Sequence, residues 1–280
     1  MTSIVVLTFN SINFIKSCLD SVFKQDCNDF EVIVVYNGSK DGTVDFIRTN
    51  YPSVELIENK ENLGACKARN QGIEASNGEW ILTLDCDISL EPSFLKRLTS
   101  LAAGLDSRVG VLQPKILKND RKTIFSCGIF LSGIRRFYDL GKDKIDNDKF
   151  DSPGYVFGSC SAASFYRKSM LEDLREDTGY FDERFFFLVE DVDLAWRAQQ
   201  RGWKAYYCPE AICYHSGNSS GSTPAERRYL CFRNRFLSIS KNENLFGKIK
   251  LIPVLFFYDL PRVMLFFLRG EVKLGREVPK

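Results

Sequence analysis

Four short apolar segments, rich in β-branched residues, alternate with segments of helical periodicity in the first part of the chain. Such apolar runs are typical of strands that are buried on both faces. The segments between them repeat apolar residues every three to four positions, as amphipathic helices do. This alternation predicts a mostly parallel central sheet with helices on both faces. The expected strands are residues 4–7, 31–36, 54–57 and 80–84, and the expected helices are 15–23, a helix from about 43, and 65–75.

The second half of the chain is less regular. It predicts a strand at 109–112 and a helix at 190–201, and it predicts two strands at 205–207 and 212–214 that lead to His215. The stretch 157–163 is composed of small and apolar residues, which suits backbone that packs closely against another element. The charged stretches 118–122 and 142–149 have the character of solvated loops.

Polar residues follow three of the expected strands at the point where each strand ends. They are Thr8 to Asn10 after the first strand, Asn37 to Asp41 after the second, and Asp85 to Asp87 after the fourth. Ligands of open α/β sheets bind beyond the carboxyl ends of the strands. The sequence therefore predicts a single crevice lined by these three segments.

Asp85 and Asp87 are separated by one residue at the end of an apolar strand. Carboxylate oxygens suit Mg²⁺ or Mn²⁺, which usually also bind phosphate oxygens of a substrate. His215, the single histidine, could serve as a third ligand. A D-x-D pair alone is weak evidence because Asp is common in loops, and a single His is more often structural.

Glu190, Asp191 and Asp193 begin a helix directly after the apolar run 185–189. An acid that emerges from such a run is a candidate for a raised pKa and for general-base catalysis. Arg197 could orient one of these carboxylates. Acids at a helix N-terminus are also explained by the helix dipole, which is the alternative for any of the three.

Lys67 and Arg69 lie near the start of the expected helix after Gly64. Together with N–H groups at the helix end they could neutralise phosphates. An exposed basic helix face is the alternative.

Several motifs together resemble glycosyltransferase family 2, and they are most similar to its rhamnosyltransferase-like branch. The resemblance extends from about Ser3 to Gly217, with the motifs in order and at the expected spacing. The motifs are V-V-L-T-F-N, N-G-S-K-D-G-T, N-L-G-A-C-K-A-R-N-Q-G, D-C-D and G-Y-F-D-E-R-F-F-F-L-V-E-D-V-D-L-A-W-R, followed by H-S-G. The R-N-R at 233–235 and the apolar stretch after it also resemble that branch, less specifically.

The resemblance implies a GT-A fold, a Rossmann-like α/β domain, and inverting transfer of a sugar from a nucleotide donor of UDP or dTDP type to a hydroxyl of a glycan or lipid-linked acceptor. It implies a divalent cation, Mg²⁺ or Mn²⁺. Site residues that match the family's motifs are Thr8, Asn10, Asp41, Arg69 and Asp85 for the nucleotide, Asp85, Asp87 and His215 for the metal, and Asp191, paired with Glu190, for general-base catalysis. We also expect Tyr36, Asn37 and Lys67 on the nucleotide side of the site.

One position departs from the family pattern. Where the family usually has an Asp that reads the pyrimidine edge, this chain has Tyr36. A phenol can donate and accept a hydrogen bond but cannot supply the charge of a carboxylate. Either the backbone reads the base at this position or the donor base differs.

The C-terminal part of the chain differs in charge from the rest. The whole chain has 38 Lys/Arg and 36 Asp/Glu, which is too balanced for a protein whose whole surface binds nucleic acid. From Ala225 to Lys280, however, 12 basic residues stand against 5 acidic ones. We therefore expect a GT-A domain over residues 1–222 and a helical, basic and apolar tail over 223–280.

The stretch 251–268 is nearly all apolar, but Pro253, Asp259, Pro261 and Arg262 interrupt it. This is too short and too interrupted for a membrane-spanning helix. Its flanking basic residues, Lys248, Lys250, Arg269 and Lys273, suit a segment that lies in a membrane interface. If so, a chain truncated near Ser222 should fold. The alternative is a helical pair that packs on the protein's own domain.

Nine Cys residues, with no C-x-x-C pair, favour reduced thiols over a disulfide framework. The chain opens directly into a strand-like run, so we expect no signal peptide and a cytoplasmic protein that is peripheral on the inner face of the cell membrane. Two other functions stay open. A non-catalytic nucleotide-sugar binder is favoured by Tyr36 and opposed by the intact acids, and a nucleotidyltransferase would need a glycine-rich basic motif that residues 10–14 lack.

Overall fold

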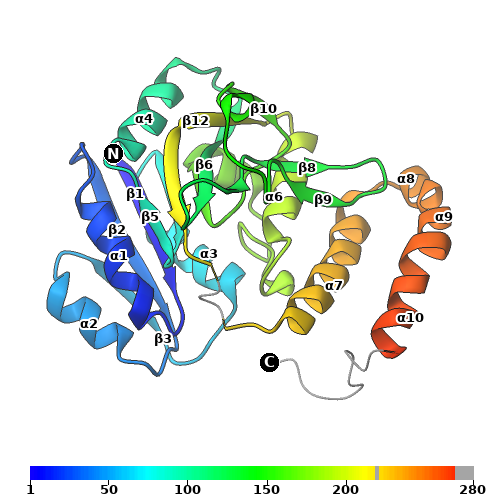
Figure 1. Ribbon diagram of the computed structural model, residues 1–280, viewed down its shortest axis with the longest axis horizontal. Helices are drawn as coiled ribbons and strands as arrows, with labels where there is room; N and C mark the ends of the chain where they lie inside the picture. The colour runs from blue at the N-terminus through cyan, green and yellow to red at the C-terminus, as the bar shows by residue number, and fades with distance from the viewer. Residues whose placement is uncertain (218–220, 269–280) are drawn as a thin grey trace.

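A computed structural model describes residues 1–217 and 221–268. Its centre is one large sheet with the strand order β10-β12-β6-β11-β4-β1-β2-β3, in which β5 adds to β12 and β7 adds to β6 (Figure 1). A two-stranded hairpin of β8 and β9 stands apart. The strands are β1 Thr2–Thr8, β2 Phe30–Asn37, β3 Glu55–Asn59, β4 Trp80–Asp85, β5 Ile88–Leu90, β6 Val109–Lys118, β7 Ile124–Ser126, β8 Ile129–Leu131, β9 Phe137–Asp139, β10 Gly154–Val156, β11 Ala163–Arg167 and β12 Lys204–His215.

The N-terminal half confirms the expected alternation. Strands β3, β2, β1 and β4 are adjacent and parallel, so their carboxyl ends lie at one edge. Alternate side chains of these strands point to opposite faces, and both faces are buried. Helices α1 Ile12–Phe23, α2 Thr43–Asn50 and α4 Phe94–Gly104 cover one face. Helices α3 Ala65–Ala75, α5 Lys168–Leu174 and α6 Glu190–Gln200 cover the other.

The C-terminal half of the sheet differs from the expectation at one strand. Residues 204–215 form the single strand β12, whereas two strands were predicted. The register of β12 against β6 shifts between Cys208 and Ile212. Pro209 lies in this interval, and a proline cannot donate to the ladder. The break in apolar pattern therefore marks a bulge within one strand.

The C-terminal region is not uniform. Helix α7 (Pro224–Asn242) begins with a capping box between Thr223 and Glu226, and its buried residues are all polar: Asn234, Arg235, Ser238 and Asn242. It packs beside α6 (Figure 1). Helix α7 thus follows the alternative in which the tail packs on the domain.

Beyond α7 the chain forms α8 (Leu245–Lys250), α9 (Ile252–Val254), a π-helical segment (Leu255–Asp259) and α10 (Leu260–Leu268). These elements lie on the outer side of α7, away from the sheet (Figure 1). No helix among residues 1–217 and 221–268 has the length and apolarity that crossing a membrane requires. Arg269 and Lys273, two of the expected basic flanks, lie outside the described residues.

Short 3₁₀ turns complete the structure at Asp148–Phe150 and Glu183–Phe185. The nine cysteines are all free, as expected.

Candidate active site

Strand pairing brings the three expected metal ligands together. Asp85 is the last residue of β4, and Asp87 directly precedes β5. Because β5 pairs with the end of β12, His215 lies opposite Ile88 and next to Asp87. One ligand atom from each of Asp85, Asp87 and His215 lies within 4.8 Å of the others, and His215 Nε2 is 3.4 Å from Asp87 Oδ1.

The chemistry of this cluster suits a divalent cation. Two carboxylates and an imidazole nitrogen are ligands that Mg²⁺, and still more Mn²⁺, accept. Burial raises the pKa of Asp85, the positive charge of Arg69 opposes that effect, and the negative charge of Asp87 adds to it. Two neighbouring carboxylates in a half-buried site are mutually repulsive, and a cation would relieve this repulsion. Phe125 packs against the His215 ring with centroids 4.1 Å apart, which limits the ring's movement.

Arg69 connects the metal side of the site to the acidic start of α6. Its Nη2 donates to Asp85 Oδ1 at 2.7 Å, and its Nη1 donates to Glu190 Oε1 at 2.5 Å. The side chains of Arg69 and Glu190 are each only 3% exposed. Ser161 Oγ donates to the same Glu190 oxygen at 3.2 Å. Glu190 is therefore held as the partner of Arg69.

Asp191 has a different environment. Its Oδ1 accepts a hydrogen bond from Val192 N at 2.8 Å, and its Oδ2 accepts one from Ser161 N at 3.2 Å. Burial, followed by the negative charge of Glu190, raises the pKa of Asp191 to about 7. No positively charged side chain pairs with it in the described part of the chain. A carboxylate with this pKa is suited to accept a proton near neutral pH.

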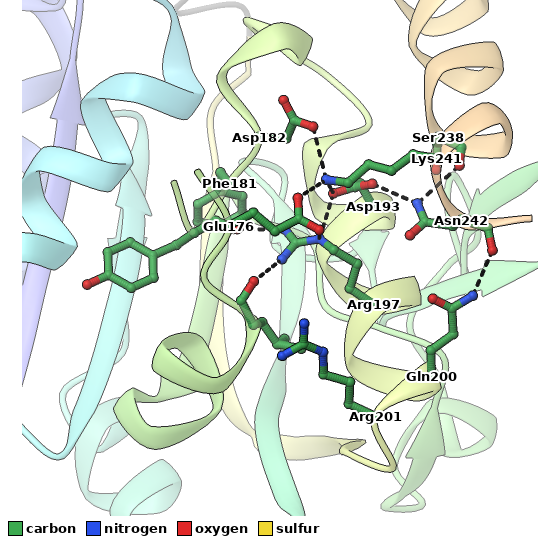
Figure 2. Close-up of polar contacts among 12 residues, drawn as sticks. Glu176, Phe181, Asp182, Asp193, Arg197, Gln200, Arg201, Ser238, Lys241 and Asn242 are labelled. Atoms are coloured by element: carbon green, nitrogen blue, oxygen red, sulfur yellow. Dashed lines mark hydrogen bonds and ion pairs between the residues drawn. The ribbon is translucent and has the colours of Figure 1, made fainter. Parts of the chain in front are cut away.

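Asp193 and Arg197 lie away from this site. Arg197 donates to Asp193 Oδ2 at 2.9 Å and to the carbonyl oxygens of Leu174 and Tyr180, so it orients Asp193 and not Asp191. Figure 2 shows that Lys241 and Asn242 of α7 reach the same Asp193 carboxylate, at 3.0 and 2.7 Å. Asp191 and Asp193 of α6 therefore have separate environments. Asp191 lies at the site, and Asp193 lies in a buried polar network.

That network joins α6 to α7. Lys241 also pairs with Asp182 at 2.9 Å and with Glu176 at 2.5 Å (Figure 2). Burial alone would raise the pKa of Asp182, but hydrogen bonds from Arg184 and Lys241 outweigh it and hold the pKa well below its usual value. Lys241 thus shares the compensation of these buried carboxylates with Arg184 and Arg197.

The loop before α6 has an unusual backbone. Phe186, Leu188 and Val189 all have positive φ, at 65°, 68° and 73°. Non-glycine residues rarely adopt such values, and a β-branched residue such as Val is a marked exception. Each such residue costs on the order of 1–3 kcal/mol, and such residues are concentrated at functional sites.

The nucleotide-side residues expected after β1 and β2 lie together, and two of them organise loops. Asp41 accepts hydrogen bonds from Ile12 N and from Thr43 N and Oγ1, which ties the start of α1 to the start of α2. Asn10 accepts one from Lys40 N at 3.1 Å. Thr8 is fully buried, and its hydroxyl has no hydrogen-bond partner among the described residues.

Asn37 and Tyr36 end β2, and their side chains are engaged within the protein. Asn37 is hydrogen-bonded to Asn59, Asn62 and Leu63, so it orders the loop that leads to α3. The hydroxyl of Tyr36 donates to the carbonyl of Ser39. The phenol thus fixes the second loop from within.

Lys67 is not brought into the cluster. Its side chain is 45% exposed and lies 3.4 Å from Glu183, away from Asp85 and Asp87. Lys67 therefore lies on an exposed face of α3, which was the alternative expected from the sequence.

Sequence reasoning missed three contributors to the site. Ser161 belongs to the small-residue stretch 157–163, whose packing partner is α6: a Cβ at Gly158 would lie 2.3 Å from Ala195 Cβ. Asp139 adds negative charge near Asp191, and Lys142 donates to Asp139 at 2.8 Å. The signal for Ser161 was present in the small residues, whereas Lys142 begins the stretch 142–149 that was expected to be a solvated loop, and no pattern singled out Asp139.

The family model described as Glycosyl transferase family 2 matches residues 3–175. Among curated proteins, the chain is similar to the N-acetylglucosaminyl-diphospho-decaprenol L-rhamnosyltransferase of Mycobacterium tuberculosis. The two are 29% identical over 249 residues, which cover 79% of this chain and 78% of the relative.

Solved structures show the same fold. The mannosyltransferase PcManGT from Pyrobaculum calidifontis, in complex with GDP-Man and Mn²⁺, has a TM-score of 0.63 and 18% identity, and the match covers 99% of this chain and 76% of that one. TarS 1-349 from S. aureus, in complex with UDP, has a TM-score of 0.61 and 21% identity, with 98% and 75% covered. At these identities the likeness is one of fold, and that fold is the expected GT-A.

Proposed function

This chain belongs to glycosyltransferase family 2, and on that basis we propose that it transfers a sugar with inversion from a nucleoside-diphosphate sugar to a hydroxyl of a glycan or lipid-linked acceptor. It is a glycosyltransferase, and the curated relatives that it matches are named as glycosyltransferases. The donor that we propose is of UDP or dTDP type. The acceptor class follows from the relative in Mycobacterium tuberculosis, whose name specifies a sugar linked to decaprenol through a diphosphate.

The observation that carries the proposal is the bridge made by Arg69. By pairing with both Asp85 and Glu190, it fixes the distance between the two parts of the site. Inverting transfer needs a base on the acceptor hydroxyl and compensating charge on the departing diphosphate, on opposite sides of one anomeric carbon. A buried guanidinium that pairs with both carboxylates keeps the base side and the diphosphate side of the site at a fixed separation.

Asp191 is the proposed base. It takes the proton of the acceptor hydroxyl as the oxygen bonds to the anomeric carbon, and the bond to the diphosphate oxygen breaks with its electron pair. Glu190 is the second candidate from the sequence, but its pairing with Arg69 suits a positioning role. The pKa of Asp191, raised to about 7, leaves a useful fraction ionised at neutral pH and gives it more basicity than an exposed Asp.

Asp85, Asp87 and His215 would hold a Mg²⁺ or Mn²⁺ ion, which when bound supplies positive charge to the donor diphosphate. Thr8 and Asn10 are proposed to line the nucleoside pocket beside the loop that Asp41 ties together. Because Tyr36 is engaged with Ser39, we propose that backbone groups of residues 36–39 read the base.

We also propose that the surface of α8–α10 contacts the membrane where such an acceptor resides. Apolar side chains there are exposed to water, among them Phe246, Phe256 and Phe257 at 67%, 57% and 85%. Lys248, Lys250 and Arg262 add positive charge. Exposed apolar side chains beside basic residues suit an interface with anionic headgroups.

The test is a screen of UDP- and dTDP-sugars with Mn²⁺, using N-acetylglucosamine linked through a diphosphate to a short polyprenol, and octyl glycosides, as acceptors. We expect one donor to be turned over, and Asp191→Asn to bind that donor normally while transfer falls about 10²–10⁴-fold. Donor binding without turnover in any combination would favour the non-catalytic binder. Near-normal transfer by Asp191→Asn would place the base elsewhere.

A further inference from the structure

The R-N-R motif at 233–235 has no role in the site described so far. Asn234 lies in the middle of it, on α7, and is fully buried. Its Nδ2 lies within hydrogen-bond distance of three carbonyl oxygens: Phe185 at 3.0 Å, Phe187 at 2.9 Å and Leu188 at 2.6 Å. These carbonyls belong to the loop that immediately precedes Glu190 and Asp191.

The conformation of that loop needs external support. Phe186 has φ 65° and ψ −58°, and Phe187 N donates to Phe185 O at 2.7 Å, which together define a γ-turn of the rare, strained kind. Leu188 and Val189 continue with positive φ. Such a backbone persists only where its surroundings hold it.

The opposite side of the loop is held by α3. The carbonyl of Phe186 accepts from Ala65 N at 2.7 Å and from Cys66 N at 3.3 Å. A Cβ at Gly64 would lie 2.5 Å from the Phe186 ring, so the approach requires glycine there. The four consecutive carbonyls from 185 to 188 thus all accept hydrogen bonds, from α3 on one side and from α7 on the other.

Arg233 fixes the orientation of the Asn234 amide. Its Nε donates to Asn234 Oδ1 at 2.8 Å, which directs the amide nitrogen to the loop, and its Nη2 donates to Phe185 O at 2.9 Å. An amide has donor and acceptor on one planar group, so it can serve Arg233 and the carbonyls together. A carboxylate at this position would accept from Arg233 but would face the carbonyls with a negative oxygen.

We propose that Asn234 is a positioning residue for sugar transfer: it holds the strained loop 185–189 so that the carboxylate of Asp191 faces the acceptor side of the site. The proposal rests on the proposed function. Arg233 acts through Asn234, and the motif thereby has a role in orienting the base. Release of the loop should lower turnover and leave donor binding intact, because Asp85, Asp87 and His215 are held by other elements.

The experiment uses Asn234→Asp in the full chain, with Arg235→Gln as control. Arg235 is the next residue of the same helix and is also buried, but it bonds Asp259 and the carbonyls of Ile134 and Arg135. Hydrogen–deuterium exchange of peptides covering 185–192 reports on the loop without any substrate. Transfer with the donor and acceptor from the screen reports kcat and KM, and calorimetry reports the Kd for UDP with Mn²⁺.

We expect Asn234→Asp to speed exchange in 185–192 and to lower kcat about 10²-fold, the size of a misplaced catalytic group, with unchanged KM and Kd for the nucleotide. Arg235→Gln should leave exchange in 185–192 and kcat unchanged. Unchanged exchange, or wild-type kcat, in Asn234→Asp would overturn the proposal, as would equal losses in both variants.

If Asn234→Asp does not fold, Arg233→Gln carries the same test, because it removes the donor that orients the amide and keeps Asn234. It should lower kcat with KM unchanged, and a wild-type kcat would overturn the proposal. If the wild type transfers no sugar, the proposed function fails, and the exchange data still decide whether Asn234 holds the loop.

Discussion

Arg69 and Glu190 form a buried ion pair across 121 positions of the chain, with Nη1 and Oε1 2.5 Å apart. The second nitrogen of the same guanidinium binds Asp85. A planar fork with two donors can hold two carboxylates in a fixed geometry, which a lysine cannot do. The arrangement of the whole site thus depends on one arginine at the start of α3.

Replacement of Arg69 by Met should destabilise the protein and abolish transfer. Removal of one partner of a buried ion pair leaves an uncompensated buried charge, which costs about 3–5 kcal/mol. Urea unfolding measures the change in the free energy of unfolding. The matched control is Arg48→Met, whose pairs with Asp45 and Glu58 are exposed and should contribute at most about 1 kcal/mol. An equal decrease in the free energy of unfolding in the two variants would show that the Arg69 bridge contributes no more to stability than an exposed ion pair.

Asp87→Ala should remove divalent-cation binding while the fold survives. Asp87 contributes a carboxylate to the cluster with Asp85 and His215 at the edge of the sheet. Titration of Mn²⁺ followed by electron paramagnetic resonance reports binding without any donor. Asp20→Ala, a change at a partly exposed acid of α1 that binds Lys16 and Tyr51, is the control and should bind Mn²⁺ like the wild type. Wild-type affinity in Asp87→Ala would remove the metal assignment.

Transfer should depend on pH through Asp191. Its pKa is raised to about 7, and only the ionised carboxylate can accept the acceptor proton. Since ionisation increases with pH, kcat should rise tenfold per pH unit below about 7 and level off above it. Asp191→Asn should lower the rate and remove this rising limb. If kcat of Asp191→Asn still rises with pH over the same range, the titration belongs to another group.

Periodicity and strand-end motifs were sufficient to predict the parallel half of the sheet, because β1 to β4 and α1 to α3 are formed by local patterns that tertiary contacts do not oppose. The same patterns predicted the meeting of Asp85 and Asp87. They did not predict one continuous β12, because Pro209 interrupts its pattern while the pairing with β6 continues. The position of His215 beside Asp87 depends on the antiparallel pairing of β12 with β5, which no local sequence pattern predicts.

The contribution of α7 was also hidden from the sequence. The buried residues of α7, Asn234, Arg235, Ser238 and Asn242, are all polar, and its Cys231 and Leu237 pack against the core while only partly buried. Such a helix lacks the broad apolar stripe by which an amphipathic helix is recognised in a sequence. What it buries is a polar network, and the bonds that join it to the domain connect residues more than forty positions apart, such as Asn242 with Asp193 and Asn234 with Phe185. Long-range polar contacts of this kind have no periodic signature.

Truncation after Ser222 should therefore prevent folding, in contrast to the expectation from the sequence. It removes Lys241 from Asp182 and Asp193, whose side chains are buried, and removes Asn234 from the loop before α6. Truncation after Asn244 retains these contacts and should give a folded protein that binds nucleotide. Circular dichroism and solubility compare the two. A folded chain 1–222 would show that α7 is dispensable for the domain.

The full chain should bind anionic vesicles through the surface of α8–α10. Phe257 and Phe256 are exposed to water at 85% and 57%, and burial of such side chains in the headgroup region provides attraction that salt does not screen. Lys248, Lys250 and Arg262 should each add about 1 kcal/mol of attraction to anionic lipid, which salt does screen. Co-sedimentation with phosphatidylglycerol vesicles should thus weaken at high salt without disappearing.

The apolar and electrostatic parts of this binding can be separated by substitution. A double change of Phe256 and Phe257 to Ser should remove the binding that remains at high salt, and Lys248→Ser with Lys250→Ser should remove the part that depends on salt. Because all four side chains lie beyond α7, both variants should keep the melting temperature of the wild type and its turnover of a soluble octyl glycoside. Vesicle binding by the chain truncated after Asn244, at the level of the full chain, would show that another surface contacts the membrane. Absence of binding by the full chain at low salt would exclude the interface, and the sugar-transfer site at Arg69 and Asp191 would stand without it.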